Sequence, residues 1–411
     1  MEWGINFTAW PEMLAWPYLI LNGWLPYRDI TIAHNPLLLF DLVIFYKIFG
    51  VGIIQLKIYT WLLIGLNTYL TYFVATKFWN KKTGFVSSVL YLLLCIVYEG
   101  NGLWFDLALV PFALLLYYSI KLKKYVLAGI VFALGFLTKQ TFIYLLIPLL
   151  LSEIKNKNTL LTRGKKFLKG SVVIGIIFLL IMFAFGIADD FYLWAVKFGV
   201  FYLPRAEGQV LMPTLKQFIF SVAPFTVLIF NPSLLPWVLA GAAGVYPRFE
   251  LFHFQPALPF LAIAISGFIF SDRKILIKGI VVVAVLAFLF IGLKRQIGIN
   301  TRFIEPEVVR VVEEIRKSGV EKIYVINYWD NIYALTNTVP STTPLIPYIP
   351  WYLLYGNSKY LILNDLKSKM PEVIVVNGKD RLEFVELKDF IDKFYSCNIT
   401  DKQLELCKKN K

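Results

Sequence analysis

The chain is short of charged residues and of histidine, and each shortage excludes a class of protein. Only 17% of its 411 residues are charged and 58% are hydrophobic, whereas soluble globular proteins have about 25% charged residues. This composition argues against a water-soluble single domain. The two histidines, His34 and His253, exclude a histidine-rich metal site. No short repeat is visible, which argues against a fibrous protein.

Nucleotide-binding motifs are also missing. The chain has neither a phosphate-binding GxxxxGK(S/T) loop nor a GxGxxG ahead of a helix, so we expect no nucleotide cofactor. It has no DxD motif, and the Asp189-Asp190 doublet falls in a loop, so metal dependence stays open. The net charge of +14 could indicate nucleic acid. Lysines and arginines kept in cytoplasmic loops give a membrane protein the same excess, and we expect no nucleic-acid partner.

Long apolar runs fill the middle of the chain. A span needs roughly 20 apolar residues, or fewer in a short, packed helix. The runs are 54–76, 84–99, 104–120, 125–138, 141–151, 170–187, 214–230, 233–246, 254–271 and 275–293. We predict a polytopic α-helical membrane protein of about ten spans plus interfacial helices, with a small C-terminal α/β soluble domain. The predicted parts are a first outer loop (1–53), a transmembrane domain (54–297) and the α/β domain (298–411).

Basic clusters orient these spans. They are Lys77/Lys81/Lys82, Lys121/Lys123/Lys124, the run from Lys155 to Lys169, and Arg273/Lys274/Lys278. Cytoplasmic loops are enriched in Lys and Arg, so the clusters should share the cytoplasmic side. The 125–151 stretch, broken at Lys139, could be one long helix. The clusters on both sides of it favour two short spans that meet at Lys139 on the outer surface. The C-terminal domain and the 188–213 and 247–253 loops then also lie outside.

The N-terminal segment raises a question of topology. Residues 1–53 would lie outside, yet no span or signal peptide precedes them. Either a first helix is missing from this sequence, or residues 36–50 are a span and the orientation is reversed. We favour the first, because 36–50 is short and carries Asp41 and Lys47, as an amphipathic interfacial helix would. Residues 10–29 are predicted to form an interfacial loop with turns at Gly23 and Pro26.

Four stretches resemble the GT-C membrane glycosyltransferases, in particular relatives of the dolichyl-phosphate-mannose protein mannosyltransferases and lipid A aminoarabinose transferases. They read ILNGWLPYRDITIAHNPLL, AGIVFALGFLTKQTFIYLLIPLLL, YPRFELFHFQPALPFLAIAI and KIYVINYWDNIYALTNTVPSTTPLIPYIPWY. The resemblance covers nearly the whole chain. It implies a sugar donor on a polyprenyl phosphate or diphosphate, an acid in the first outer loop that acts as base for the acceptor hydroxyl, and inversion at the anomeric carbon.

The resemblance places the catalytic acid at Glu12, although many members have an Asp or an Asp-Glu pair where this chain has Pro11 before Glu12. Asp29 is the second candidate, and its alternative role is an ion pair with Arg28 that anchors the loop. Asp106 lies just inside the outer end of a span. An unpaired acid there is costly, so it should face the cavity or find a cation. The alternative is a helix N-terminal charge stabilised by the dipole.

The candidate phosphate-binding residues are Lys139, Gln140, Arg248 and His253. Lys139 at the outer surface suits a lipid phosphate as a compact point charge, or it snorkels to the headgroups. Gln140 beside it could bond the sugar or the phosphate. Arg248 could clamp phosphate through two hydrogen bonds, or be neutralised by Glu250. His253 is either a donor to the ligand or a satisfied interfacial histidine.

The C-terminal region alternates helices and strands. Helices are predicted at 305–318, 358–369 and 387–396, a helix or turn at 331–335, and strands at 322–327 and 373–376. This alternation predicts a parallel pair of strands in a small α/β layer. Cys397 and Cys407 could form a disulfide if they face an oxidising compartment, whereas Cys95 in an apolar run is expected to serve packing.

The leading hypothesis is therefore an inverting hexosyl- or pentosyltransferase, multi-pass in the cell membrane. It would take its sugar from a polyprenyl phosphate and pass it to a protein, lipid or glycan acceptor at the outer face. The alternative is a polytopic lipid or solute transporter of envelope biogenesis, and a third reading is a noncatalytic assembly protein. Transporters usually show internal repeats and helices broken at mid-membrane. We find no repeated halves, and the polar candidates gather at one surface.

Overall fold

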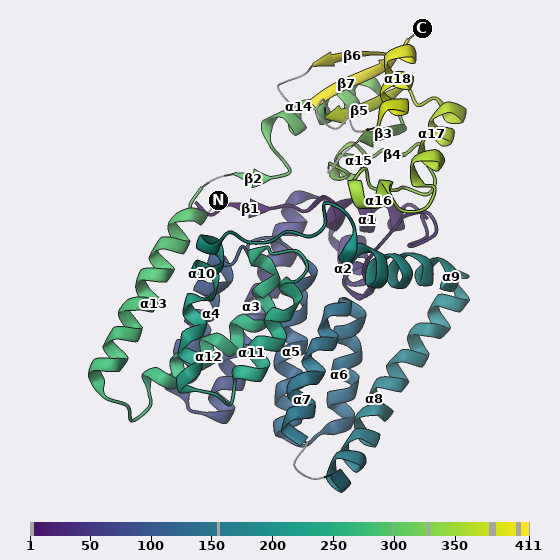
Figure 1. Cartoon of the computed structure of the whole chain (residues 1–411). Coiled ribbons are helices and arrows are strands. Elements are labelled where there is room, and N and C mark those ends of the chain that lie inside the picture. Colours follow the sequence, from purple (N-terminus) through teal and green to yellow (C-terminus); the bar gives the residue numbers. More distant parts are fainter. Residues whose placement is uncertain are drawn as a thin grey trace.

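A computed structural model describes residues 4–153, 157–298, 300–326, 329–377, 384–399 and 404–410. Helices make up the chain as far as Gln296, and an α/β unit sits on one end of this helical bundle (Figure 1). Two predicted features fall outside the described residues. They are Lys155, at the start of a basic cluster, and Asn327, at the end of a predicted strand.

Every predicted apolar run is helical. The helices are α3 (Ile53–Phe78), α4 (Lys81–Val97), α5 (Phe105–Lys121), α6 (Tyr125–Thr138), η1 (Gln140–Leu145), α7 (Leu146–Glu153), α8 (Lys157–Ala184), α10 (Leu215–Val222), η4 (Ala223–Phe230), α11 (Leu235–Ala242), η5 (Ala243–Val245), η6 (Leu251–Ala257), α12 (Leu258–Ile269) and α13 (Ile275–Gln296). Within the described residues, four segments are long and apolar enough to cross a membrane: Ile53–Phe78, Leu161–Ala184, Leu251–Ile269 and Ile275–Gln296. The helical character is confirmed, and the count of about ten spans stays a prediction.

The helix ends that flank the basic clusters lie at one end of the bundle. Figure 1 shows the end of α7, the start of α8 and the α12–α13 connection far from the α/β unit. Asp106 at the start of α5 contacts Lys139 at the end of α6. The α5–α6 connection therefore lies at the other end of these helices, with the other basic clusters. The turn after α4 lies beside the N-terminal segment, because Thr8 N donates to Asn101 O. The α3–α4 connection, at the other end of α4, therefore also lies with the basic clusters.

The N-terminal segment contains a helix that the sequence reading missed. Residues Pro11–Leu21 form α1, where an interfacial loop was predicted. Its side chains are buried on nearly every side of the helix, and Met13, Leu14 and Leu19 are completely buried. The helix therefore has no polar face, and its sequence lacks the alternation of polar and apolar residues that identifies an amphipathic helix. The predicted turn at Gly23 follows it, with a φ of +88°. The helix predicted at 36–50 is present as α2 (Leu37–Phe49), which packs against α1; its place in the membrane interface stays a prediction.

The C-terminal unit is a five-stranded mixed sheet flanked by helices. The strands are β3 (Lys322–Ile326), β4 (Val339–Pro340), β5 (Val373–Asn377), β6 (Tyr395–Ile399) and β7 (Leu404–Lys409), in the order β4-β3-β5-β7-β6. The helices are α14 (Pro306–Ser318), α15 (Asn331–Thr336), α16 (Pro350–Leu353), α17 (Ser358–Lys369) and α18 (Val385–Phe394). The predicted parallel pair is β3 and β5, with Val325 opposite Val375. The antiparallel strands β6 and β7 were not predicted, because they are largely polar.

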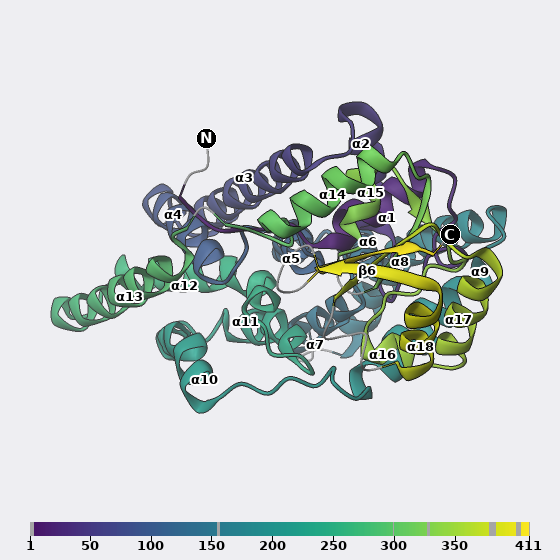
Figure 2. The ribbon, with the colours of Figure 1, turned by 90° about the horizontal axis from the view of Figure 1, so that it is seen from above.

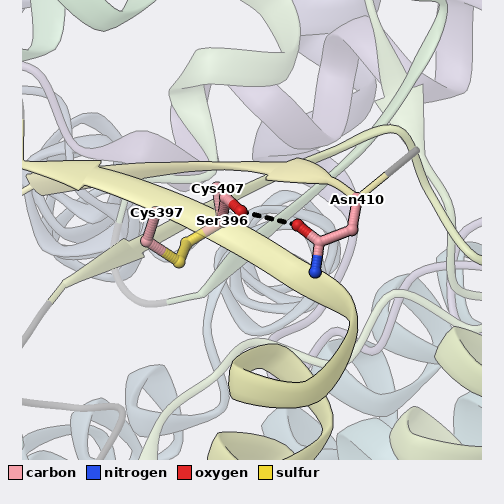
Figure 3. Close-up of a disulfide and its surroundings, with 4 residues drawn as sticks. All are labelled: Ser396, Cys397, Cys407 and Asn410. Carbon is pink, nitrogen blue, oxygen red and sulfur yellow. Dashed lines mark hydrogen bonds between the residues drawn. A yellow bond between two sulfur atoms is a disulfide. The ribbon is translucent and has the colours of Figure 1, made fainter.

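Cys397 and Cys407 lie opposite each other on β6 and β7 and form a disulfide (Figure 3). The Ser396 hydroxyl donates to Asn410 Oδ1 at 2.6 Å across the same pair of strands. Cys95 is buried and free, in agreement with a packing role.

Three sets of contacts join the C-terminal unit to the bundle. Strand β1 (Phe7–Thr8) pairs in parallel with β2 (Thr301–Arg302), next to the end of α13. Leu345 exchanges backbone hydrogen bonds with the first outer loop, through Thr31 N at 3.0 Å and Asp29 O at 2.7 Å. After α9 (Ala188–Phe191), a π-helix, η2 (Tyr192–Tyr202), stacks Phe198 on Tyr352 with ring centroids 4.5 Å apart. The first part of the 188–213 loop is therefore helical and packs against the C-terminal unit.

Candidate active site

A cavity of about 580 Å³ lies where the bundle meets the C-terminal unit. Its walls come from α1, the loop before α2, η1, η2 with the following η3 (Leu203–Arg205), the η5–η6 region, β2 and residues 347–352. Six residues singled out from the sequence either line it or are bonded to residues that line it. Glu12, Lys139, Gln140, Arg248 and His253 line it, and Asp106 is bonded to two of them.

Glu12 enters the cavity from the first turn of α1. Pro11 takes the first helical position, where its missing N–H costs no hydrogen bond. The Glu12 side chain is partly exposed to the cavity, and its Oε2 is buried with no hydrogen-bond partner among the described residues. Burial raises the pKa of Glu12 from 4.5 to about 7. A carboxyl poised near neutrality is suited to accept a proton from a substrate.

Lys139, Asp106 and His253 form a buried cluster in the cavity wall, with Asp106 behind the other two. The ammonium of Lys139 donates to Asp106 Oδ2 at 2.5 Å, and His253 Nδ1 lies 2.8 Å from the same oxygen. Their exposed fractions are 5%, 1% and 8%. Asp106 has found a cation, as the cost of an unpaired acid there predicted, and it also lies in the first turn of α5, where the alternative reading placed it. Lys139 does not snorkel outward, since α6 ends at Thr138 and the extended Lys139 turns its side chain inward.

Gln140 braces the cavity wall. Its amide nitrogen donates to Ala33 O at 2.9 Å and to Ala195 O at 3.2 Å. The side chain thereby ties the first outer loop to η2. With both amide N–H groups used, the carbonyl oxygen is the part of Gln140 left for other partners.

Arg248 connects the outer loop of the bundle to the C-terminal unit. Its Nε pairs with Glu250 Oε1 at 3.2 Å, and its guanidinium stacks over Trp351 at 5.4 Å from the ring centroid. The neutralisation by Glu250 that the sequence suggested is therefore present. Nη1 also approaches Gly208 O at 3.4 Å. Arg248 remains in the cavity wall with part of its guanidinium exposed.

Asp29 stands apart from the other candidates. It is not among the residues that line the cavity, and its Oδ2 accepts a hydrogen bond from Leu25 N at 2.8 Å. The pair with Arg28 that the sequence suggested is not formed, because Arg28 Nε bonds Asp190 Oδ2 at 3.2 Å instead. The described contacts of Asp29 fix the turn after α1 and offer no route to the cavity.

Several cavity residues were not identified from the sequence. His34 lines the wall, and burial together with the charge of Lys139 lowers its pKa to about 3, so it is neutral. Trp10 and Trp104 pack 5.0 Å apart beside it, and Arg302 stacks on Trp10. Tryptophans were expected at a membrane interface. Nothing in the local sequence distinguishes those that line a cavity from those that face lipid.

Comparisons with known proteins agree with this architecture. Residues 33–185 match the profile of the family described as dolichyl-phosphate-mannose-protein mannosyltransferase. A search of curated proteins finds no match. ArnT from Cupriavidus metallidurans in the apo state superposes with a TM-score of 0.65 at 11% identity, over 98% of this chain and 94% of that one.

Two further solved structures are similar. ArnT bound to undecaprenyl phosphate gives a TM-score of 0.64 at 11% identity, over 98% of this chain and 94% of that one. The Archaeoglobus fulgidus oligosaccharyltransferase tethered with an acceptor peptide gives 0.52 at 11% identity, over 98% of this chain and 70% of that one. At such identities the likeness shows the fold.

Proposed function

We propose that this chain, which belongs by its fold to the GT-C superfamily of membrane glycosyltransferases, transfers a sugar from a polyprenyl phosphate to an acceptor hydroxyl with inversion. One observation carries the proposal. A single cavity gathers an acid with raised pKa, a buried lysine cluster and an arginine, each from a different part of the chain. A base and cations around one cavity are what transfer from a phosphate leaving group requires.

In the proposed reaction Glu12 takes the proton of the acceptor hydroxyl. The hydroxyl oxygen attacks the anomeric carbon from the face opposite the phosphate, so the new carbon–oxygen bond forms as the bond to the phosphate oxygen breaks. The polyprenyl phosphate leaves with the bonding electrons. Lys139 and Arg248 stabilise the charge that develops on it. His253 and Gln140 complete the wall on the phosphate side.

Two observations support an outer-face reaction. The described helix ends that flank the basic clusters lie at the end of the bundle away from the cavity, and Lys and Arg favour cytoplasmic loops. A disulfide stabilises the C-terminal unit, and disulfides persist in oxidising compartments outside the cytosol. The proposal therefore puts the cavity and the C-terminal unit on the extracytoplasmic side.

The test uses the purified chain in lipid nanodiscs with polyprenyl phosphates that carry radiolabelled hexoses or pentoses, offered with protein, lipid and glycan acceptors. General-base catalysis contributes roughly 100- to 10,000-fold, so Glu12→Gln should lower transfer at least 100-fold. Glu313→Gln is the matched control, because Glu313 is an exposed acid on α14. Full transfer by Glu12→Gln would overturn the role of Glu12. Consumption of none of the donors by the wild type would favour the transporter.

A further inference from the structure

A buried acid of the C-terminal unit, Asp330, interacts electrostatically with Glu12. It precedes α15 in the C-terminal unit and is 4% exposed. Aspartate at this position commonly caps the helix by accepting a backbone N–H of the first turn, yet the Asp330 side chain makes no such bond. Its Oδ1 is buried without a hydrogen-bond partner among the described residues. The side chain is therefore not used for the local role that its position offers.

Helices α1 and α14 pack against α15, the helix that begins directly after Asp330. Figures 1 and 2 show α1 beside α15, and the two helices are in contact. Glu12 on α1 is the charged group that acts on Asp330, and the hydroxyls of Tyr324 on β3 and Tyr333 on α15 are the other titratable groups that interact with it. Within the described part of the chain, no lysine or arginine pairs with Asp330. The interface thus holds two carboxyl groups and no compensating cation.

The charged and titratable groups near Glu12 are on its other side. Those that share the cavity with it are Lys139, His34, Arg248, Glu250, His253 and Arg302. Tyr46 of α2 is occupied, because its hydroxyl donates to Met13 O at 3.1 Å. Glu12 therefore lies between a cavity that contains cations and an interior that contains only another acid.

A buried carboxyl without a cation keeps its proton, because the anion would lose its hydration with nothing in exchange. Burial and the charge of Glu12 hold the pKa of Asp330 well above its ordinary value. Asp330 is then a neutral hydrogen-bond donor at physiological pH. Glu12 Oε2 is a buried acceptor without a partner on the adjoining helix.

Resting on the proposed function of Glu12, we propose that Asp330 is its positioning residue: the Asp330 carboxyl, buried and unpartnered next to α1, donates a hydrogen bond to the unpartnered Glu12 Oε2 and leaves Oε1 to take the acceptor proton. This bond would satisfy two unpaired buried groups at once. It also gives the C-terminal unit a part in the chemistry, since that unit supplies the donor to a base carried by the bundle.

The experiment measures kcat/KM for sugar transfer from pH 5.5 to 9.5 in wild type, Asp330→Asn and Asp330→Leu. A hydrogen bond to a charged group changes an equilibrium constant roughly 10- to 100-fold. Asp330→Leu removes the donor, so the midpoint of the acid limb should rise by at least one pH unit. Its kcat/KM should fall tenfold or more at pH 6.5 and recover at pH 9.5. Asp330→Asn keeps a neutral donor and should keep the wild-type midpoint.

Two kinetic results would overturn the proposal. One is an Asp330→Leu profile that is lowered by the same factor at every pH, which indicates a structural role alone. The other is an Asp330→Asn midpoint that moves as far as the Leu midpoint. If Asp330→Leu does not fold, the thermal stability of Asp330→Asn still tests the proposal. A carboxyl that stays protonated in the folded state but ionises in the unfolded chain lowers the free energy of unfolding at pH values above its unfolded pKa. Asp330→Asn should melt higher than wild type at pH 8 and equally at pH 4, and equal melting at both pH values would overturn the proposal.

Failure of the proposed function gives a different result. If Glu12→Gln transfers sugar normally, Glu12 is not the base, and a positioning role for Asp330 falls with it. The melting comparison still reports whether Asp330 carries the proton. The Glu313→Gln variant serves as control in both measurements, since its exposed side chain should change neither.

Discussion

Glu12→Gln should make the protein more stable at alkaline pH while it abolishes activity. Burial raises the pKa of Glu12 from 4.5 to about 7, so the folded state holds a proton that the unfolded chain releases. The sign follows from this difference. Below pH 4.5 both states are protonated and burial of the carboxyl adds no ionisation cost. Between pH 4.5 and 7 the wild type loses stability by about 1.4 kcal/mol for each pH unit, and above pH 7 the loss is complete.

The full loss amounts to about 3 kcal/mol, an upper bound because the Glu12 side chain is partly exposed to the cavity. Glutamine cannot ionise, so the variant should melt several degrees above wild type at pH 8 and within error of it at pH 4. Thermal unfolding in detergent, followed by tryptophan fluorescence from pH 4 to 8.5, measures this, with Glu313→Gln as control. The reasoning is refuted if Glu12→Gln is no more stable than wild type at pH 8, or if its advantage persists at pH 4.

Three further predictions concern the cavity wall. Lys139→Met should lower the free energy of unfolding by about 3 kcal/mol, because it leaves Asp106 buried without its lysine. The double variant Lys139→Met/Asp106→Asn should recover that stability but not donor binding, which melting and donor-binding assays measure separately. Recovery of donor binding by the double variant would contradict a phosphate role for Lys139. His34→Gln should leave the pH profile of transfer unchanged between pH 5 and 8, because His34 with a pKa of about 3 is already neutral there; a shifted midpoint would show that it titrates. Glu250→Gln should free Arg248 and make undecaprenyl phosphate bind roughly tenfold more tightly, because charge-assisted hydrogen bonds are worth about 1.5–3 kcal/mol. An unchanged Kd in a titration would argue that Arg248 does not reach the phosphate.

The sequence predicted the features that depend on local composition. Apolar length located the helices, and the basic clusters separated α6 from α7 at Lys139. The family resemblance selected Glu12, and Lys139 and Arg248 follow from the cost of placing charge near a membrane. These residues line one cavity, which Glu12 enters from the first turn of α1, Lys139 from the end of α6 and Arg248 from the loop between η5 and η6.

The features that the sequence did not predict depend on contacts between distant segments. The sequence did not show which cation would pair with Asp106, because its partner Lys139 lies 33 residues further along the chain. Helix α1 has no polar face, because the C-terminal unit covers the side that would otherwise meet solvent. The sequence does not single out Asp330, because an aspartate before a short helix is ordinarily an N-cap. Its significance appears only when α15 is packed against α1.

The charge arrangement of the cavity bears on turnover. Lys139 and Arg248 each already have a carboxylate partner, Asp106 and Glu250. A phosphate that enters the cavity must therefore compete with these carboxylates for hydrogen bonds, so its net gain is smaller than it would be from free cations. The charge on the leaving phosphate grows as the sugar bond breaks, and the cations can respond to that growth without having bound the donor tightly beforehand. Partly neutralised cations thus favour the transition state over the polyprenyl phosphate product, which a membrane enzyme must release before each new cycle.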